Sequence, residues 1–179
     1  MAPGFPGCYH RCMRLHFSIP LALAAVAAVS ACSPKFDWRD YRSAEAPYSV
    51  LFPGKPASHT RTVDLDGRAT AMTMTAAEID GTIFAVGSAA LSDEAQARHA
   101  VVSMRTAMVR NIGGRVSKEA ERDGAVEIEA HGTNGAHPTQ LHGRFVARGN
   151  RVYQVIVMGP EKAIDAENID TFIRSFKLN

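Results

Sequence analysis

Four glutamates at alternate positions suggest a cation site: Glu119, Glu121, Glu127 and Glu129. Asp123-Gly124 between them is a favoured β-hairpin turn. A turn through residues 123–125 places Glu121 opposite Glu127, and the same register places Glu119 opposite Glu129. Like charges directly across a ladder destabilise it. We therefore expect Arg115, Arg122 or water to dissipate the repulsion in a solvated acidic face, or a cation such as Ca²⁺ to bind the carboxylates.

Histidines form the second group with potential chemistry. His131 precedes a predicted loop over residues 133–138, His137 lies in that loop, and His142 follows it. A loop that brought His131 and His137 together would offer neutral imidazoles, which suit Zn or Cu. The spacing does not match the HExxH motif of a zinc enzyme. We prefer ordinary surface histidines and keep a metal site as the alternative.

Catalytic motifs are missing from the sequence. It contains no GxSxG segment and no glycine-rich phosphate loop after a predicted strand. Gly113-Gly114 follows a predicted helix, where glycine ends helices. We therefore expect a protein that is not an enzyme and that carries no cofactor.

The elements around these residues alternate between strands and helices. Residues 48–52 read as a strand that Pro53-Gly54 ends. Asp-Gly pairs at residues 66–67 and 80–81 predict hairpins that join three further strands. A helix is expected after Ser92, its predicted N-cap. Its apolar residues recur at helical spacing: Val101, Met104, Met108 and Ile112.

The second half repeats this layout. Strands are expected over residues 115–122, 125–133, 140–148 and 151–158. A terminal helix is expected from apolar residues spaced i, i+3, i+4 and i+7: Ile169, Phe172, Ile173 and Phe176. The order ββββ-α-ββββ-α predicts an α+β fold, a mainly antiparallel sheet with two helices on one or both faces.

Two segments resemble PsbP-like domains. Residues 48–56, Tyr-Ser-Val-Leu-Phe-Pro-Gly-Lys-Pro, are similar to the opening motif of these domains. Residues 172–177, Phe-Ile-Arg-Ser-Phe-Lys, are similar to their closing motif. The resemblance implies one αβα sandwich over residues 47–179. It transfers no residue of the photosystem role, because function resides in sites and not in folds.

The N-terminal region reads as a secretion signal. Arg11 and Arg14 precede an apolar stretch over residues 19–29, which ends in Val-Ser-Ala before Cys32. The stretch is short for a membrane span, which needs about 20 residues. The Val-Ser-Ala-Cys sequence resembles the lipobox of bacterial lipoproteins. This implies removal of residues 1–31 and acylation of Cys32. We expect translation to start at Met13.

Residues 32–46 are predicted to be a lipidated cysteine followed by a polar tether. Trp38 and Tyr41 lie in this segment and are expected to contact the membrane interface or a partner. The alternative is that Trp38 packs under the sheet as a plug. Trp38-Arg39 also resembles uncharacterised proteobacterial lipoproteins of similar size. Ser33 after the cysteine, where aspartate signals inner-membrane retention, implies an outer-membrane anchor facing the periplasm.

Charge and cysteine content restrict the partners. The chain has 20 basic and 18 acidic residues, and the 18 basic residues after Cys32 match the acidic ones. This balance argues against a nucleic-acid partner. The cysteines are Cys8, Cys12 and Cys32, so the predicted domain has no disulfide.

Two function classes follow from the sequence. In the first, a membrane-anchored envelope lipoprotein is a non-catalytic binding or assembly module for an unknown envelope protein. In the second, it carries a small ligand or metal ion in a pocket between sheet and helix. A deep pocket lined by the glutamates or histidines favours the second class, and a shallow apolar patch favours the first.

Overall fold

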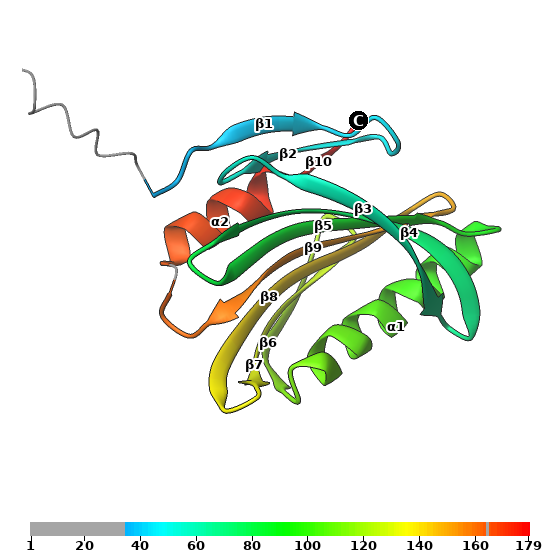
Figure 1. Ribbon diagram of the computed structural model, residues 1–179. Helices are drawn as coiled ribbons and strands as arrows, with labels where there is room; N and C mark the ends of the chain where they lie inside the picture. Colours follow the sequence, from blue (N-terminus) through cyan, green and yellow to red (C-terminus); the bar gives the residue numbers. More distant parts are fainter. Residues whose placement is uncertain (1–34, 164) are drawn as a thin grey trace, which may run out of the picture. The chain divides into compact units, whose positions relative to one another are not determined.

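The computed structural model describes residues 35–163 and 165–179 (Figure 1). The predicted signal peptide and the lipidation site at Cys32 lie outside these residues. Within the described residues, no helix is both long and apolar enough to cross a membrane.

The main sheet has seven strands in the order β3-β4-β5-β9-β8-β7-β6, and every neighbouring pair is antiparallel. In chain order, these strands are β3 (Ala57–Leu65), β4 (Arg68–Ile79), β5 (Thr82–Ala90), β6 (Arg115–Arg122), β7 (Ala125–Asn134), β8 (His137–Arg148) and β9 (Arg151–Pro160). A second sheet, β1-β2-β10, consists of β1 (Arg39–Arg42), β2 (Tyr48–Phe52) and β10 (Lys177–Leu178). The predicted α+β fold is confirmed.

One helix packs on each face of the main sheet. The helix α1 (Glu94–Asn111) covers one face, while α2 (Ala166–Ser175) and the small sheet cover the other (Figure 1). Successive side chains of a strand point to opposite faces. On β9, Val155 and Val157 therefore belong to the core on the α2 side, and Ile156 to the core on the α1 side. The layers follow the predicted αβα order.

Short turns fix the register of the hairpins. Asp123 and Gly124 have φ angles of 52° and 71°. Positive φ at both central residues is typical of the type I′ turn, whose twist matches the flanking strands. The Asp-Gly turns at residues 66–67 and 80–81 show the same pair of positive angles, as their sequence predicts.

Both helices have an aspartate as their N-cap. Asp93, one residue after the predicted cap Ser92, accepts a hydrogen bond from the backbone N–H of Gln96 at 2.8 Å. The prediction of Ser92 as N-cap was therefore wrong by one residue, because the cap must stand immediately before the first helical residue. Asp165 caps α2 in the same way. The predicted apolar face of α2 is confirmed, with Ile169 and Phe172 buried.

The predicted tether differs from the structure over part of its length. Residues 39–42 form β1, which pairs with β2, and Ala46 is buried. Phe36 and Trp38 pack on the core beneath α2. The tether was predicted because the segment is mostly polar. Its aromatic side chains nevertheless pack against the core, because burying their apolar surface is favourable.

Candidate functional site

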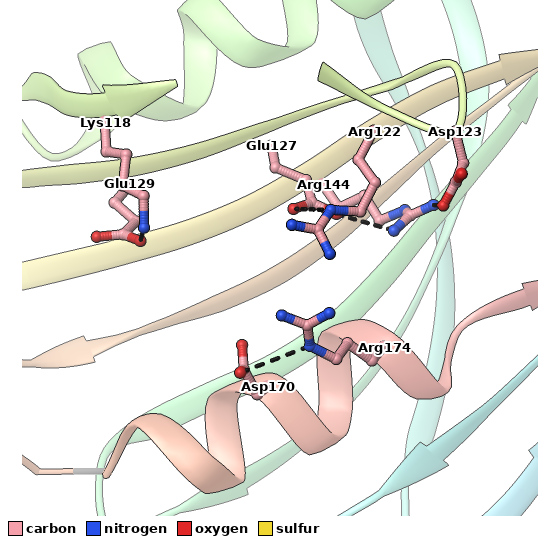
Figure 2. A network of polar contacts seen from close by, with 8 residues as sticks. All are labelled: Lys118, Arg122, Asp123, Glu127, Glu129, Arg144, Asp170 and Arg174. Carbon is pink, nitrogen blue, oxygen red and sulfur yellow. Dashed lines mark hydrogen bonds and ion pairs between the residues drawn. The ribbon is translucent and has the colours of Figure 1, made fainter. Parts of the chain in front are cut away.

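A cleft of about 140 Å³ opens between α2 and the part of the main sheet that contains β6, β7 and β8. Charged side chains reach it from both walls, as Figure 2 shows. The charged residues that line it are Lys118, Arg122, Glu127, Glu129, Asp170 and Arg174. His142 lies on the sheet side, and Ile169 and Ile173 of α2 add apolar surface.

The register of β6 and β7 decides which glutamates enter the cleft. The two-residue turn pairs Arg122 with Ala125, so Glu121 lies opposite Val126 and Glu119 opposite Ile128. The predicted pairs Glu121–Glu127 and Glu119–Glu129 are therefore wrong. The prediction placed three residues in the turn, and a slip of one residue changes the face to which side chains point.

The four glutamates consequently divide between the two faces. Glu127 and Glu129 point to the cleft beside α2, whereas Glu119 pairs with an arginine of α1, Arg105. The same two-residue turn brings Lys118 opposite Glu129, and the register irregularity lies beyond this pair, between Val116 and Lys118. The observed register therefore replaces the predicted glutamate pair with an ion pair.

Each cleft glutamate has a basic partner at hydrogen-bond distance. The Nζ of Lys118 lies 2.8 Å from Oε1 of Glu129, and this hydrogen bond lowers the pKa of the Glu129 carboxyl. A guanidinium nitrogen of Arg144 lies 2.8 Å from Oε1 of Glu127. Across the described residues, no group of three or more His, Cys, Asp or Glu side chains is arranged to hold a metal ion.

The paired histidine site is also not assembled. His131 lies on the α2 side of β7, and its Nδ1 is 2.9 Å from a carboxylate oxygen of Glu161. His137 pairs with Asn134, three positions further along β7 than His131. An odd separation places the two histidine side chains on opposite faces of the sheet.

His142 lies opposite Glu129 in the cleft. Burial lowers its pKa below the ordinary value of 6.5, against the opposing effect of the Glu129 carboxylate. Asp170 also raises the pKa slightly, while His131 and Lys118 lower it. The imidazole is therefore mainly neutral at pH 7 and can donate one hydrogen bond and accept another.

We expect His142 to make stability depend on pH near neutrality. The unfolded chain binds a proton at this residue more readily than the folded protein does, so unfolding becomes easier as the pH falls through 6.5. The dependence levels off below the pKa of folded His142. Urea denaturation at several pH values between about 7.5 and 5.5, the range in which histidine titrates, should show this change in the free energy of unfolding. His142→Gln should flatten the slope. An equal slope in wild type and His142→Gln would refute the prediction.

We also expect the two cleft glutamates to differ in their contribution to stability. Arg144 is only 16% exposed, so Glu127→Gln leaves a poorly solvated cation without its carboxylate and should cost about 2 kcal/mol. Glu129→Gln breaks a pair with exposed Lys118 and should cost less than about 1 kcal/mol. Urea denaturation at pH 7 of both variants measures the difference. Equal losses would contradict this assignment.

The structure places Trp38 and Tyr41 against the core. The ring of Trp38 stacks on Phe36 at 5.8 Å and meets the ring of Phe84 edge-on at 6.4 Å. Tyr41 meets Phe52 edge-on at 5.5 Å. Both side chains are half-buried. These contacts agree with the plug alternative, and contact with a membrane or partner remains a prediction.

The basic half of the cleft consists of Lys118, Arg122, Arg144 and Arg174, of which only Arg122 was predicted to lie near the glutamates. Lys118 and Arg144 lie on strands that pair locally, so a correct hairpin register would have found them. Arg174 comes from α2, and no local pattern indicates that this helix faces β6.

The comparisons with known proteins leave the family open. No protein-family model and no curated protein matches the chain. A crystal structure from Bacteroides thetaiotaomicron VPI-5482 is similar with a TM-score of 0.41 and 14% sequence identity, over 79% of this chain and 48% of that chain. The chain thus spans about half the length of that protein, and a similarity of this size supports no conclusion about function.

Proposed function

We propose that the protein is a lipoprotein of the bacterial cell envelope and that its PsbP-like domain is a non-catalytic binding or assembly module. Acyl chains on Cys32 would hold it at the outer membrane with the domain facing the periplasm. The leader and the Val-Ser-Ala-Cys sequence support this location. More than one acyl chain is needed for stable anchoring, and a lipoprotein carries more than one.

The charged cleft is the observation that supports a binding role. Its hydrogen-bonding groups come from β6, β7, β8 and α2, and ion pairs between these elements hold several of them in place. Its volume of about 140 Å³ is small beside the sites of drug-sized ligands, which measure roughly 300–1,000 Å³. Such a cleft suits a single chemical group that a larger partner presents.

A small-ligand carrier is the second candidate. The cleft lies between a sheet and a helix and contains Glu127 and Glu129, the arrangement that favours this class. A ligand small enough to enter the cleft alone would need no protein partner.

Fractionation of the cell envelope tests the anchor. We expect the wild type to remain in membranes washed with high salt, to dissolve in detergent, and to carry an acylated Cys32 as its first residue. Cys32→Ala should abolish acylation. Release of the wild type by salt alone, or an N-terminus upstream of Cys32, would refute the proposal.

Site-specific photocrosslinking in intact envelopes tests the binding role. A photoreactive residue in place of Ala120, which lines the cleft, should capture one protein in stoichiometric amount. The same residue in place of exposed Val102 on α1 is the matched control and should not capture it. Capture of the same proteins from both positions would contradict the proposal. No capture, with a small molecule bound in native mass spectrometry, would support the carrier instead.

A further inference from the structure

We propose that the cleft recognises a carboxylate, which binds between the guanidinium groups of Arg122 and Arg174. This inference rests on the proposed binding function and names the chemical group that the cleft accepts. It follows from the charges of the cleft, from the direction of the two arginines and from the apolar surface beside them.

The charges of the cleft are balanced overall but not around Arg122 and Arg174. The lining has three cationic and three acidic side chains, and outside it Arg144 lies near both Glu127 and Asp123, which makes four of each. Lys118 and Arg144 each lie 2.8 Å from one glutamate and neutralise it. Among the described residues of the lining, Asp170 is then the remaining acid, against Arg122 and Arg174.

The contacts of these two arginines are long. Nε of Arg122 lies 3.8 Å from a Glu127 oxygen, and Nε of Arg174 lies 3.5 Å from an Asp170 oxygen. Both distances exceed those of ordinary N–H···O hydrogen bonds, about 2.7–3.2 Å. A guanidinium has five N–H donors in total. Both arginines therefore retain donors that a ligand can use.

The two arginines approach the cleft from opposite walls. Arg122 ends β6, Arg174 lies in the last turn of α2, and Figure 2 shows their guanidinium groups directed toward each other across the cleft. Their side chains are 51% and 59% exposed, so a ligand from solvent reaches both. Two cations that face each other repel. An anion that binds between them adds two attractions over shorter distances, which outweigh this repulsion.

A carboxylate fits this arrangement better than a phosphate monoester. It carries one negative charge, equal to the local excess at Arg122 and Arg174, and its two oxygens match the guanidinium fork. A phosphate monoester carries about −1.5 to −2 at neutral pH and would leave excess negative charge beside Asp170. The side chains of Ala120, Ile169 and Ile173 offer apolar contact to a short carbon chain next to the carboxylate. A short aliphatic acid and the end of a peptide share this chemistry.

Arginine side-chain NMR tests the inference on the full chain, purified in an uncharged detergent at low salt. The probes are butyrate, N-acetyl-Ala-Ala, its C-terminal amide and inorganic phosphate. At least one of the two carboxylates should shift the Nε–H signals of Arg122 and Arg174 and saturate at millimolar concentration. Whichever binds more tightly identifies the source of the group. The amide should shift neither signal.

Variants assign the effect to the two arginines. Arg122→Gln and Arg174→Gln should each weaken carboxylate binding by about tenfold or more, as expected for loss of a charge-assisted hydrogen bond. Arg98→Gln on α1 is the matched control, since Arg98 also pairs with an acid four residues earlier and is similarly exposed. Arg174→Lys keeps the charge without the fork and should lose part of the affinity.

Three results would overturn the inference. These are no shift with either carboxylate, tighter binding of phosphate than of both carboxylates, and unchanged carboxylate affinity in both glutamine variants. Its failure is distinct from failure of the proposed function. If the photoreactive residue at position 120 captures a protein but neither carboxylate binds, only the carboxylate inference is refuted. If a carboxylate binds but salt alone releases the protein from membranes, only the proposed membrane anchor is refuted.

Discussion

Replacement of Phe84 by alanine is expected to lower the free energy of unfolding by about 3–5 kcal/mol. Phe84 is fully buried, and its ring meets the ring of Phe172 at 5.4 Å and those of Phe36 and Trp38 at 6.4 Å. It thus connects the main sheet to α2 and to the segment before β1. The alanine variant loses apolar burial and leaves a cavity among rings that cannot all move inward.

Urea denaturation of the full chain measures this loss, with Val102→Ala as the control. Val102 is 54% exposed on α1 and should change stability by less than about 0.5 kcal/mol. Trp38→Ala should cost less than Phe84→Ala, because Trp38 is only half-buried. A loss below about 1 kcal/mol for Phe84→Ala, the usual effect of a point mutation, would show that Phe84 is not central to the core.

Replacement of Gly132 by alanine should cost about 3 kcal/mol, at the upper end of overpacking effects. A Cβ atom at Gly132 would stand 2.2 Å from the carbonyl oxygen of Ile112 and 2.8 Å from Cα of Gly114. Both are backbone atoms, so no side chain can rotate away. The same contact holds β7 against the end of α1, where the N–H of Thr133 donates to the Ile112 carbonyl at 2.7 Å.

Gly54→Ala is the matched control for this variant. A Cβ at Gly54 would meet the end of the Ile79 side chain at 3.6 Å, an ordinary van der Waals distance. The free energy of unfolding should therefore stay the same or rise slightly, because alanine lowers the conformational entropy of the unfolded chain. Gly132→Ala should shift the midpoint of urea denaturation strongly downward and Gly54→Ala should not. Equal midpoints for the two variants would mean that β7 can move away from the end of α1 with little loss of stability.

Local chemistry explains why much of the fold was predictable from sequence. The Asp-Gly turns determine their own backbone angles, and the apolar spacing of residues 169–176 depends only on helix geometry. The hairpin of β6 and β7 shows the limit. Its existence followed from Asp123-Gly124, but the register of the glutamates depended on the number of residues in the turn.

The small sheet and the cleft depend on contacts between distant parts of the chain. Residues 39–42 are polar, and their pairing with β2 has no local signature. Likewise, Arg174 lines the cleft only because α2 docks on the core through Ile169 and Phe172. The sequence showed which residues of α2 are apolar, but it did not show which strands those residues contact.

The central position of β2 in the small sheet determines when during synthesis its two sides become paired. This strand lies between β1, which precedes it, and β10, which follows every other described element. A chain emerging from its N-terminus keeps one side of β2 unpaired until Lys177 and Leu178 arrive. An open strand edge is a template for association with other chains. Nascent chains that stall after α2 should therefore be prone to aggregation, and pairing with β10 covers this edge in the folded domain.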